Sequence, residues 1–124
     1  MLDISKSMLA EDISPNRLTR AQEGLISFLK EDSGDRFSYV VFAGKPFLLS
    51  SGTSDISGLE QLVRTTTPDL IRQDVPGLSG TNIGDALLLA STVLTGNSGA
   101  IILITDGRAN LGLDPYLAAK HLQL

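Results

Sequence analysis

The segment Asp3-Ile4-Ser5-Lys6-Ser7 carries a carboxylate and two hydroxyls at alternate positions. Mg²⁺ and Mn²⁺ prefer oxygen ligands of this kind, and Mg²⁺ demands near-octahedral geometry and usually keeps several waters. Because hydroxyls are neutral ligands, an ion bound by Asp3, Ser5 and Ser7 keeps residual positive charge and attracts a further anion from outside. The pattern alone is weakly specific, since Ser and Asp are also common in turns and helix caps.

Two more oxygen-bearing side chains stand at predicted junctions between loops and regular elements. Thr81 ends a long polar stretch over 65–81, directly before a predicted helix, and Asp106 follows an apolar strand pattern. Irregular loops of this length are uncommon in compact domains and are often functional. In open α/β sheets, ligands bind beyond the carboxyl ends of the strands. Asp3 and Asp106 both follow predicted strands, so we expect them at that rim, where Thr81 offers a third hydroxyl.

The elements that position these residues alternate between strand and helix patterns. Ser14 as N-cap and Pro15 as first helical residue predict a helix that continues at 3.6-residue spacing to about Glu31. The segment Phe37–Ala43 is apolar on both faces and rich in aromatic and β-branched residues, which predicts a strand covered on both sides. A turn then leads to a short returning strand, Phe47–Ser50.

The second half of the chain shows the same alternation. Ser57 and Glu60 have the spacing of a capping box and predict a short helix. Asn82 is the predicted N-cap of the next helix, and Ala100–Ile104 has the pattern of a fully buried strand. A last helix is predicted from Asp114 to the chain end.

This order predicts an α/β fold of the doubly wound, Rossmann-like type, with a mostly parallel sheet and helices on both faces. The short link between Phe37–Ala43 and Phe47–Ser50 predicts one antiparallel hairpin at an edge. We expect Ala100–Ile104 at the other edge, where an apolar strand without proline or charge either pairs with another chain or promotes aggregation.

Composition narrows the functional classes. The chain has 124 residues, enough for one domain, and a formal net charge of −4, which disfavours non-specific binding to nucleic acid. Cysteine is absent and His121 is the only histidine, which excludes thiolate chemistry and multi-histidine zinc sites. No apolar run approaches the roughly 20 residues of a membrane span, so we expect a soluble domain of unknown compartment.

The order D-x-S-x-S, then a loop threonine, then Asp-Gly after a buried strand resembles the metal-ion-dependent adhesion site of von Willebrand factor A domains. The resemblance covers the whole chain and is closest to bacterial members of the aerotolerance-operon type. Three further segments fit the family: Gly34-Asp35-Arg36, Val40-Val41-Phe42-Ala43 and Gly84-Asp85-Ala86.

The resemblance implies that one Mg²⁺ or Mn²⁺ ion is held by five residues. Ser5, Ser7 and Thr81 then contact the ion directly or through water, while Asp3 and Asp106 act largely through bound water. The remaining coordination position belongs to an Asp or Glu of a partner protein. In similar bacterial proteins the partners include chaperone-like ATPases of the MoxR type, and the parent protein is membrane-anchored.

The chain departs from the family at both ends. Family domains usually have six strands, with two after the helix that here ends at Leu124, and several apolar residues before the motif aspartate. We therefore interpret residues 1–124 as a partial von Willebrand factor A-like domain without its C-terminal strands.

Two alternatives to a metal-dependent interaction module stay open. A magnesium-dependent phosphotransfer or phosphohydrolase enzyme also places aspartates at strand ends, but it commonly needs a nucleophilic carboxylate and a second acid. Position 5 is a serine and the motif holds no other base, so we expect no enzyme. The other alternative is a structural domain whose degenerate site binds no ion.

Overall fold

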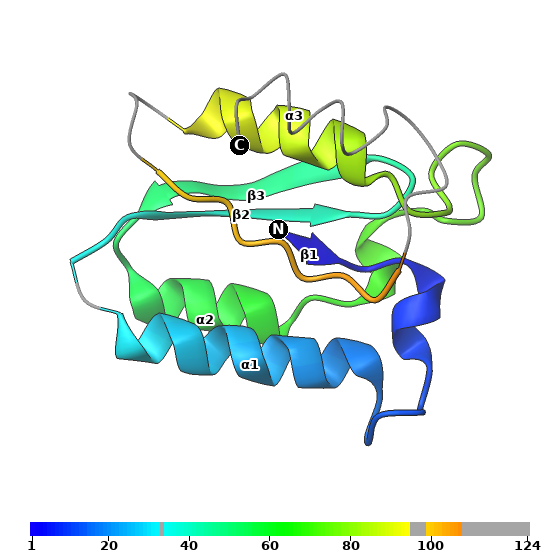
Figure 1. The fold of residues 1–124 in the computed structure, drawn as a ribbon, viewed down its shortest axis with the longest axis horizontal. Coiled ribbons are helices and arrows are strands. Elements are labelled where there is room, and N and C mark those ends of the chain that lie inside the picture. Colours follow the sequence, from blue (N-terminus) through cyan, green and yellow to red (C-terminus); the bar gives the residue numbers. More distant parts are fainter. Residues whose placement is uncertain (33, 95–98, 108–124) are drawn as a thin grey trace.

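A mixed three-stranded sheet lies at the centre of the chain (Figure 1). The structure is a computed structural model that describes residues 1–32, 34–94 and 99–107. Strand β1 (Leu2–Asp3) runs parallel to β2 (Phe37–Phe42), and β2 runs antiparallel to β3 (Pro46–Thr53). The predicted hairpin is confirmed, although β3 is longer than the predicted Phe47–Ser50.

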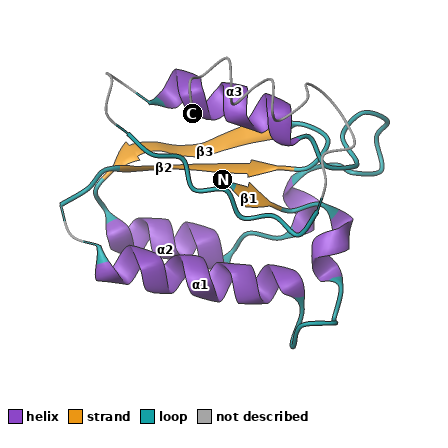
Figure 2. Cartoon of the chain, viewed as in Figure 1, coloured by secondary structure: helices purple, strands orange, loops and turns teal. Residues whose placement is uncertain are grey.

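Helices cover both faces of the sheet, which confirms the predicted fold class (Figure 2). Helices α1 (Arg17–Glu31) and α2 (Ile56–Arg64) lie on one face, and α3 (Ile83–Val93) lies on the other. Successive side chains of a strand point to opposite faces. Accordingly, Val41 belongs to the buried cluster with α1 and α2, while its neighbour Phe42 packs against α3.

The predicted starts of α1 and α2 are each wrong by two residues. The N-cap of α1 is Asn16, whose side chain accepts a hydrogen bond from the Thr19 backbone N–H. The N-cap of α2 is Asp55, which accepts from Gly58 N–H in place of the predicted Ser57. In both cases an Asx side chain directly before the first helical residue supplies the capping oxygen, whereas Ser14 lies too early in the chain and Ser57 is already inside the helix.

The third helix begins as predicted. The Asn82 side chain accepts a hydrogen bond from Asp85 N–H at 3.0 Å and donates to the Asp85 carboxylate at 2.8 Å. Before α3, the chain from 65 to 81 is largely irregular and includes one short 3₁₀ turn, η2 (Pro68–Leu70). The predicted last helix from Asp114, with His121, lies outside the described residues.

The segment 100–104 is extended but is not a fully buried strand, which corrects the sequence-based prediction. Ile104 forms an isolated parallel bridge with Leu2, and Ile102 and Leu103 are 43% and 38% exposed. The reason is geometric: β1 has only two residues to pair with, and no strand within the described ranges lies on the outer side of the segment. It therefore lies at the sheet edge.

None of the helices within the described residues combines the length and the apolar character needed to cross a membrane.

Candidate metal centre

The five predicted ligands come together at one rim of the sheet. Asp3 is the last residue of β1, and Ser5 and Ser7 lie at and within the short turn η1 (Lys6–Leu9) that follows. Thr81 directly precedes the Asn82 cap of α3, and Asp106 lies two residues beyond the Ile104 bridge. Because β1 and the 100–104 segment are parallel, their carboxyl ends meet at this rim.

Hydroxyl groups form a continuous chain at the centre of this cluster. Thr81 Oγ1 lies 3.3 Å from Ser5 Oγ, and Ser5 Oγ lies 3.1 Å from Ser7 Oγ. Ser7 Oγ in turn donates to Asp106 Oδ1 at 3.2 Å. Thr81 and Ser5 are buried, whereas Ser7 is exposed, so the chain runs from the interior to the surface.

Asp3 is fully buried, and its carboxylate connects two segments of the cluster by hydrogen bonds. Its Oδ1 accepts from the Ser5 backbone N–H at 2.8 Å, and its Oδ2 accepts from Thr105 Oγ1 at 2.7 Å. A buried carboxylate is tolerated when it is hydrogen-bonded in this way. Asp3 thus fixes the loop that carries Ser5 and ties it to the segment that carries Asp106. No local sequence pattern marks Thr105 for this role.

Asp106 has a second partner, Arg17, that no local sequence pattern predicts. Arg17 Nη1 donates to Asp106 Oδ2 at 2.6 Å, and Arg17 Nε and Nη2 both bind the Asp12 carboxylate at 2.7 Å. These hydrogen bonds raise the pKa of Arg17 above its ordinary value, with Asp12 the larger cause, and the Arg17 hydrogen bond lowers the pKa of Asp12. Arg17 is therefore part of the cluster.

The loop that presents Thr81 is held against the turn between β2 and β3. The backbone N–H of Gly44 donates to Leu78 O at 3.0 Å, and Asn82 N–H donates to Ala43 O at 2.8 Å. The Asn82 side chain adds a bond of 3.1 Å to Gly44 O. Ala43 and Gly44 directly follow β2. These contacts therefore hold the end of the loop that carries Thr81 next to the carboxyl end of β2.

Gln73 connects the same loop to the first motif. Its Nε2 donates to Ile4 O at 2.9 Å and to Pro68 O at 3.0 Å, and the side chain is buried. Because Ile4 lies between Asp3 and Ser5, this contact ties the loop over 65–81 to the first motif. No local sequence pattern marks Gln73 for this role.

The oxygen atoms present fit a small, hard cation. Adjacent ligands of an octahedral ion with bonds of about 2.1 Å lie about 3.0 Å apart, and the hydroxyl separations of 3.1 and 3.3 Å are close to this. The described residues contain no group of three or more His, Cys, Asp and Glu side chains placed to hold a metal. The ligand set in this cluster consists mainly of hydroxyls, with Asp3 and Asp106 as its only two acids.

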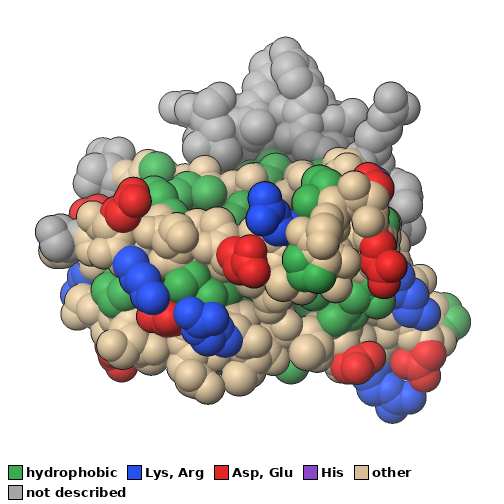
Figure 3. Space-filling view, turned by 90° about the horizontal axis from the view of Figure 1, so that it is seen from below, with side chains coloured by type: hydrophobic (Ala, Val, Ile, Leu, Met, Phe, Trp, Pro, Cys, Tyr) green, Lys and Arg blue, Asp and Glu red, His purple; other side chains and the backbone are tan. Residues whose placement is uncertain are grey.

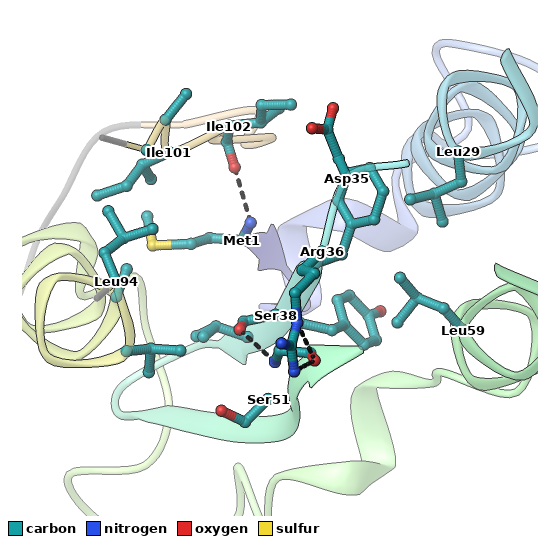
Figure 4. A pocket seen from close by; sticks show the side chains of 18 of the residues that line it. Met1, Leu29, Asp35, Arg36, Ser38, Ser51, Leu59, Leu94, Ile101 and Ile102 are labelled. Atoms are coloured by element: carbon teal, nitrogen blue, oxygen red, sulfur yellow. Dashed lines mark hydrogen bonds between the residues drawn. The ribbon is translucent and has the colours of Figure 1, made fainter. Parts of the chain in front are cut away.

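A cavity of about 900 Å³ lies at the opposite end of the strands (Figure 4). Its walls include Met1, the start of β2, and Ile101 and Ile102, whereas none of the five predicted ligands lines it. The Met1 ammonium group donates to Ile102 O at 2.7 Å, and burial lowers the pKa of this amino group to about 6. Arg36 donates twice to Gly52 O, at 2.7 and 3.0 Å. The cavity is therefore separate from the hydroxyl and carboxylate cluster.

Comparison with known proteins agrees with the fold. The von Willebrand factor type A domain family matches residues 1–108, so the chain belongs to this family. A UPF0353 protein of Mycolicibacterium gilvum (strain PYR-GCK) is 28% identical over 134 residues, which cover 97% of this chain and 38% of the relative.

Solved structures give the same result. BatB from Bacteroides thetaiotaomicron is 36% identical with a TM-score of 0.86, and the match covers 98% of this chain and 58% of BatB. An aerotolerance-related membrane protein from Bacteroides fragilis NCTC 9343 is 34% identical with the same TM-score, at 98% and 59% coverage. The proximal thread matrix protein 1 of the mussel byssus, with a zinc-occupied MIDAS motif, shares the fold at 21% identity, with a TM-score of 0.76 and 98% and 31% coverage. The chain thus spans less than two thirds of each of these proteins.

Proposed function

We propose that the cluster binds one divalent ion, Mg²⁺ or Mn²⁺, and that this ion docks an Asp or Glu side chain of a partner protein. The proposed ligands, directly or through water, are Asp3, Ser5, Ser7, Thr81 and Asp106. The observation that carries the proposal is the chain of three hydroxyls, at 3.3 and 3.1 Å, that ends on the Asp106 carboxylate.

The charge of the cluster supports docking of an acidic group. Both oxygens of Asp3 and both oxygens of Asp106 already accept hydrogen bonds from the protein. The hydroxyls that contribute most of the oxygens are neutral, so a bound divalent ion keeps much of its charge. Ser7 is exposed, which opens one side of the cluster to a partner. A partner carboxylate completes the charge balance there.

Relatives support the choice of an ion and of a membrane-anchored parent protein. The mussel protein, which shares only the fold, holds zinc at its MIDAS motif. The aerotolerance-related membrane protein from Bacteroides fragilis, which is 34% identical, supports a membrane-anchored parent protein for this domain. We further propose that its partner belongs to a MoxR-type ATPase system.

The distribution of charge argues against nucleic acid as the partner. The net charge is −4, and Figure 3 shows Lys and Arg side chains interspersed with Asp and Glu on the face formed by α1 and α2. Nucleic acid binding relies on a continuous basic surface that neutralises phosphates, and this face has none among the described residues.

The phosphohydrolase alternative is less well supported by the geometry. Both carboxylates of the cluster are held by donors, Asp3 by Ser5 N–H and Thr105, and Asp106 by Ser7 and Arg17. Neither is left free to attack phosphorus or to donate a proton. We therefore expect no turnover of an aryl phosphate in Mg²⁺, and turnover that is lost in Ser5→Ala would instead establish the enzyme.

Water proton relaxation with Mn²⁺ tests the docking function. A protein-bound Mn²⁺ that retains water accelerates the relaxation of bulk water protons, and a carboxylate that displaces this water reduces the effect. We expect the enhancement with the wild-type chain and its reduction by N-acetyl-aspartate amide, with no reduction by the matched N-acetyl-asparagine amide. If neither compound changes the enhancement, the metal site stands and the docking function is rejected.

A further inference from the structure

Arg17 connects the first turn of α1 to the proposed metal centre. Its guanidinium group is shared between two carboxylates, Asp12 through two hydrogen bonds of 2.7 Å and Asp106 through one of 2.6 Å. The Asp106 side chain is only 9% exposed, whereas that of Asp12 is 55% exposed. Arg17 thus places a fixed positive charge on the same carboxylate that faces the proposed ion.

We propose that Arg17 is an internal cation that competes with the divalent ion for Asp106. This inference rests on the proposed function and adds its regulation. Without the ion, Arg17 satisfies Asp106 Oδ2 and offsets the negative charge of the cluster. When the ion binds, two cations face one partly buried carboxylate, and their repulsion lowers the affinity for the ion.

Asp12 is the alternative partner that makes this competition adjustable. It holds two of the three Arg17 nitrogens and lies five residues before Arg17, on the exposed loop between η1 and α1. An Arg17 side chain that leaves Asp106 therefore keeps a bidentate partner and does not need to enter water unpaired. The position of the loop that carries Asp12 is in this way coupled to occupancy of the centre.

Two substitutions with opposite expected effects test the competition. Arg17→Gln removes the competing charge, and we expect it to tighten Mg²⁺ binding about tenfold, measured by isothermal titration calorimetry. Asp12→Asn removes the negative charge of the alternative partner, so that Asp106 becomes the main partner of Arg17. We therefore expect Mg²⁺ binding several-fold weaker than in the wild type. The matched control is Arg20→Gln, which removes the same charge three residues later in α1. The exposed Arg20 side chain has only a long ion pair of 3.9 Å with Glu23.

Melting curves provide a second readout that does not depend on titration heats. In EDTA, Arg17→Gln lacks the ion pair to Asp106 and melts below the wild type. In saturating Mg²⁺ this difference narrows or reverses, because the ion replaces the missing charge. A purely structural role of Arg17 predicts the same decrease in both buffers.

The outcomes separate the two proposals. Equal or weaker Mg²⁺ binding by Arg17→Gln, with normal binding by the wild type, would overturn the competition but keep the metal site. Mg²⁺ binding by the wild type that is about tenfold weaker than binding by Arg17→Gln would support both. Absence of binding in both folded proteins would overturn the metal site, and the competition with it.

Discussion

Gly44 packs directly against the backbone of Ser79: a Cβ atom added to Gly44 would lie 2.5 Å from Ser79 O. Real Cβ atoms do not approach a backbone oxygen this closely, and the carbonyl oxygen of Gly77 would lie at 2.6 Å from the same atom. The turn between β2 and β3 and the loop that leads to Thr81 therefore pack together only because residue 44 has no side chain. The position of Thr81 in the proposed metal centre depends on this contact.

We predict that Gly44→Ala weakens both the fold and the metal centre. The 77–79 backbone has to move, which costs about 1–3 kcal/mol of unfolding free energy and shifts Thr81 away from Ser5. Urea unfolding and Mg²⁺ titration measure the two effects. The matched control is Gly24→Ala in α1, where nothing lies within 4 Å of the added Cβ, and we expect a gain of about 0.5–1 kcal/mol there. Unchanged Mg²⁺ affinity in a destabilised Gly44→Ala would show that the contact serves the fold alone.

Asp3→Asn separates the charge of Asp3 from its shape. An asparagine still accepts from Ser5 N–H, and its amide donates to Thr105 Oγ1, so we expect a folded chain that is less stable by about 1 kcal/mol. Loss of the negative charge beneath the hydroxyls should lower Mg²⁺ affinity at least tenfold, as calorimetry can measure. A variant that keeps wild-type affinity would show that Asp3 only supports the loop.

Tyr39 gives the fold a predicted dependence on alkaline pH. The side chain is 4% exposed, its hydroxyl lies 2.8 Å from Thr66 Oγ1, and burial raises the pKa of Tyr39 to about 12. The unfolded tyrosine ionises near pH 10, so the stabilisation is complete below that pH and is lost as the pH rises through 12.

We therefore expect the wild type to lose about 1 kcal/mol between pH 8 and pH 11 in urea unfolding, relative to Tyr39→Phe measured under the same conditions. At pH 8 the variant should be less stable by about 1 kcal/mol, because the hydrogen bond to Thr66 is missing. Parallel pH profiles of the two proteins would contradict this assignment.

The exposed apolar edge predicts self-association of this chain. Ile102 and Leu103 are partly exposed on an extended segment that no strand covers within the described residues. We expect Ile102→Lys to reduce the association seen by light scattering in a dilution series, because a charge on an edge disfavours pairing. Ser54→Lys, at an exposed polar position, adds the same charge elsewhere as a control. A wild type that stays monomeric at high concentration would contradict the prediction.

Local patterns in the sequence were sufficient for much of the fold. The segment Phe37–Ala43 is apolar on both faces, which predicts a strand covered on both sides. In the structure α1 and α2 cover one face of β2 and α3 covers the other. The Asn82 cap was also predictable, because it depends on residues three positions apart. The starts of α1 and α2 were not, because several neighbouring polar residues qualify as caps and only the backbone path selects Asn16 and Asp55.

The composition of the proposed metal centre was only partly predictable. Its five proposed ligands follow from junctions between predicted elements, and the structure brings them together. Arg17 and Thr105 act on residues 89 and 102 positions away, so no local pattern identifies them. The apolar run Ala100–Ile104 predicts burial, but burial also requires a neighbouring element on each side, and the described residues supply only β1.

Isothermal titration of Mg²⁺ into the folded chain, repeated with Mn²⁺, tests the central claim most directly. The account predicts one ion per chain, no binding by Ser5→Ala, which loses the middle hydroxyl of the chain, and unchanged binding by Ser91→Ala on α3. At a free ion concentration about 100 times the dissociation constant, binding should stabilise the wild type by roughly 2.7 kcal/mol. Absence of binding by the folded wild type, or equal binding by Ser5→Ala, would contradict it.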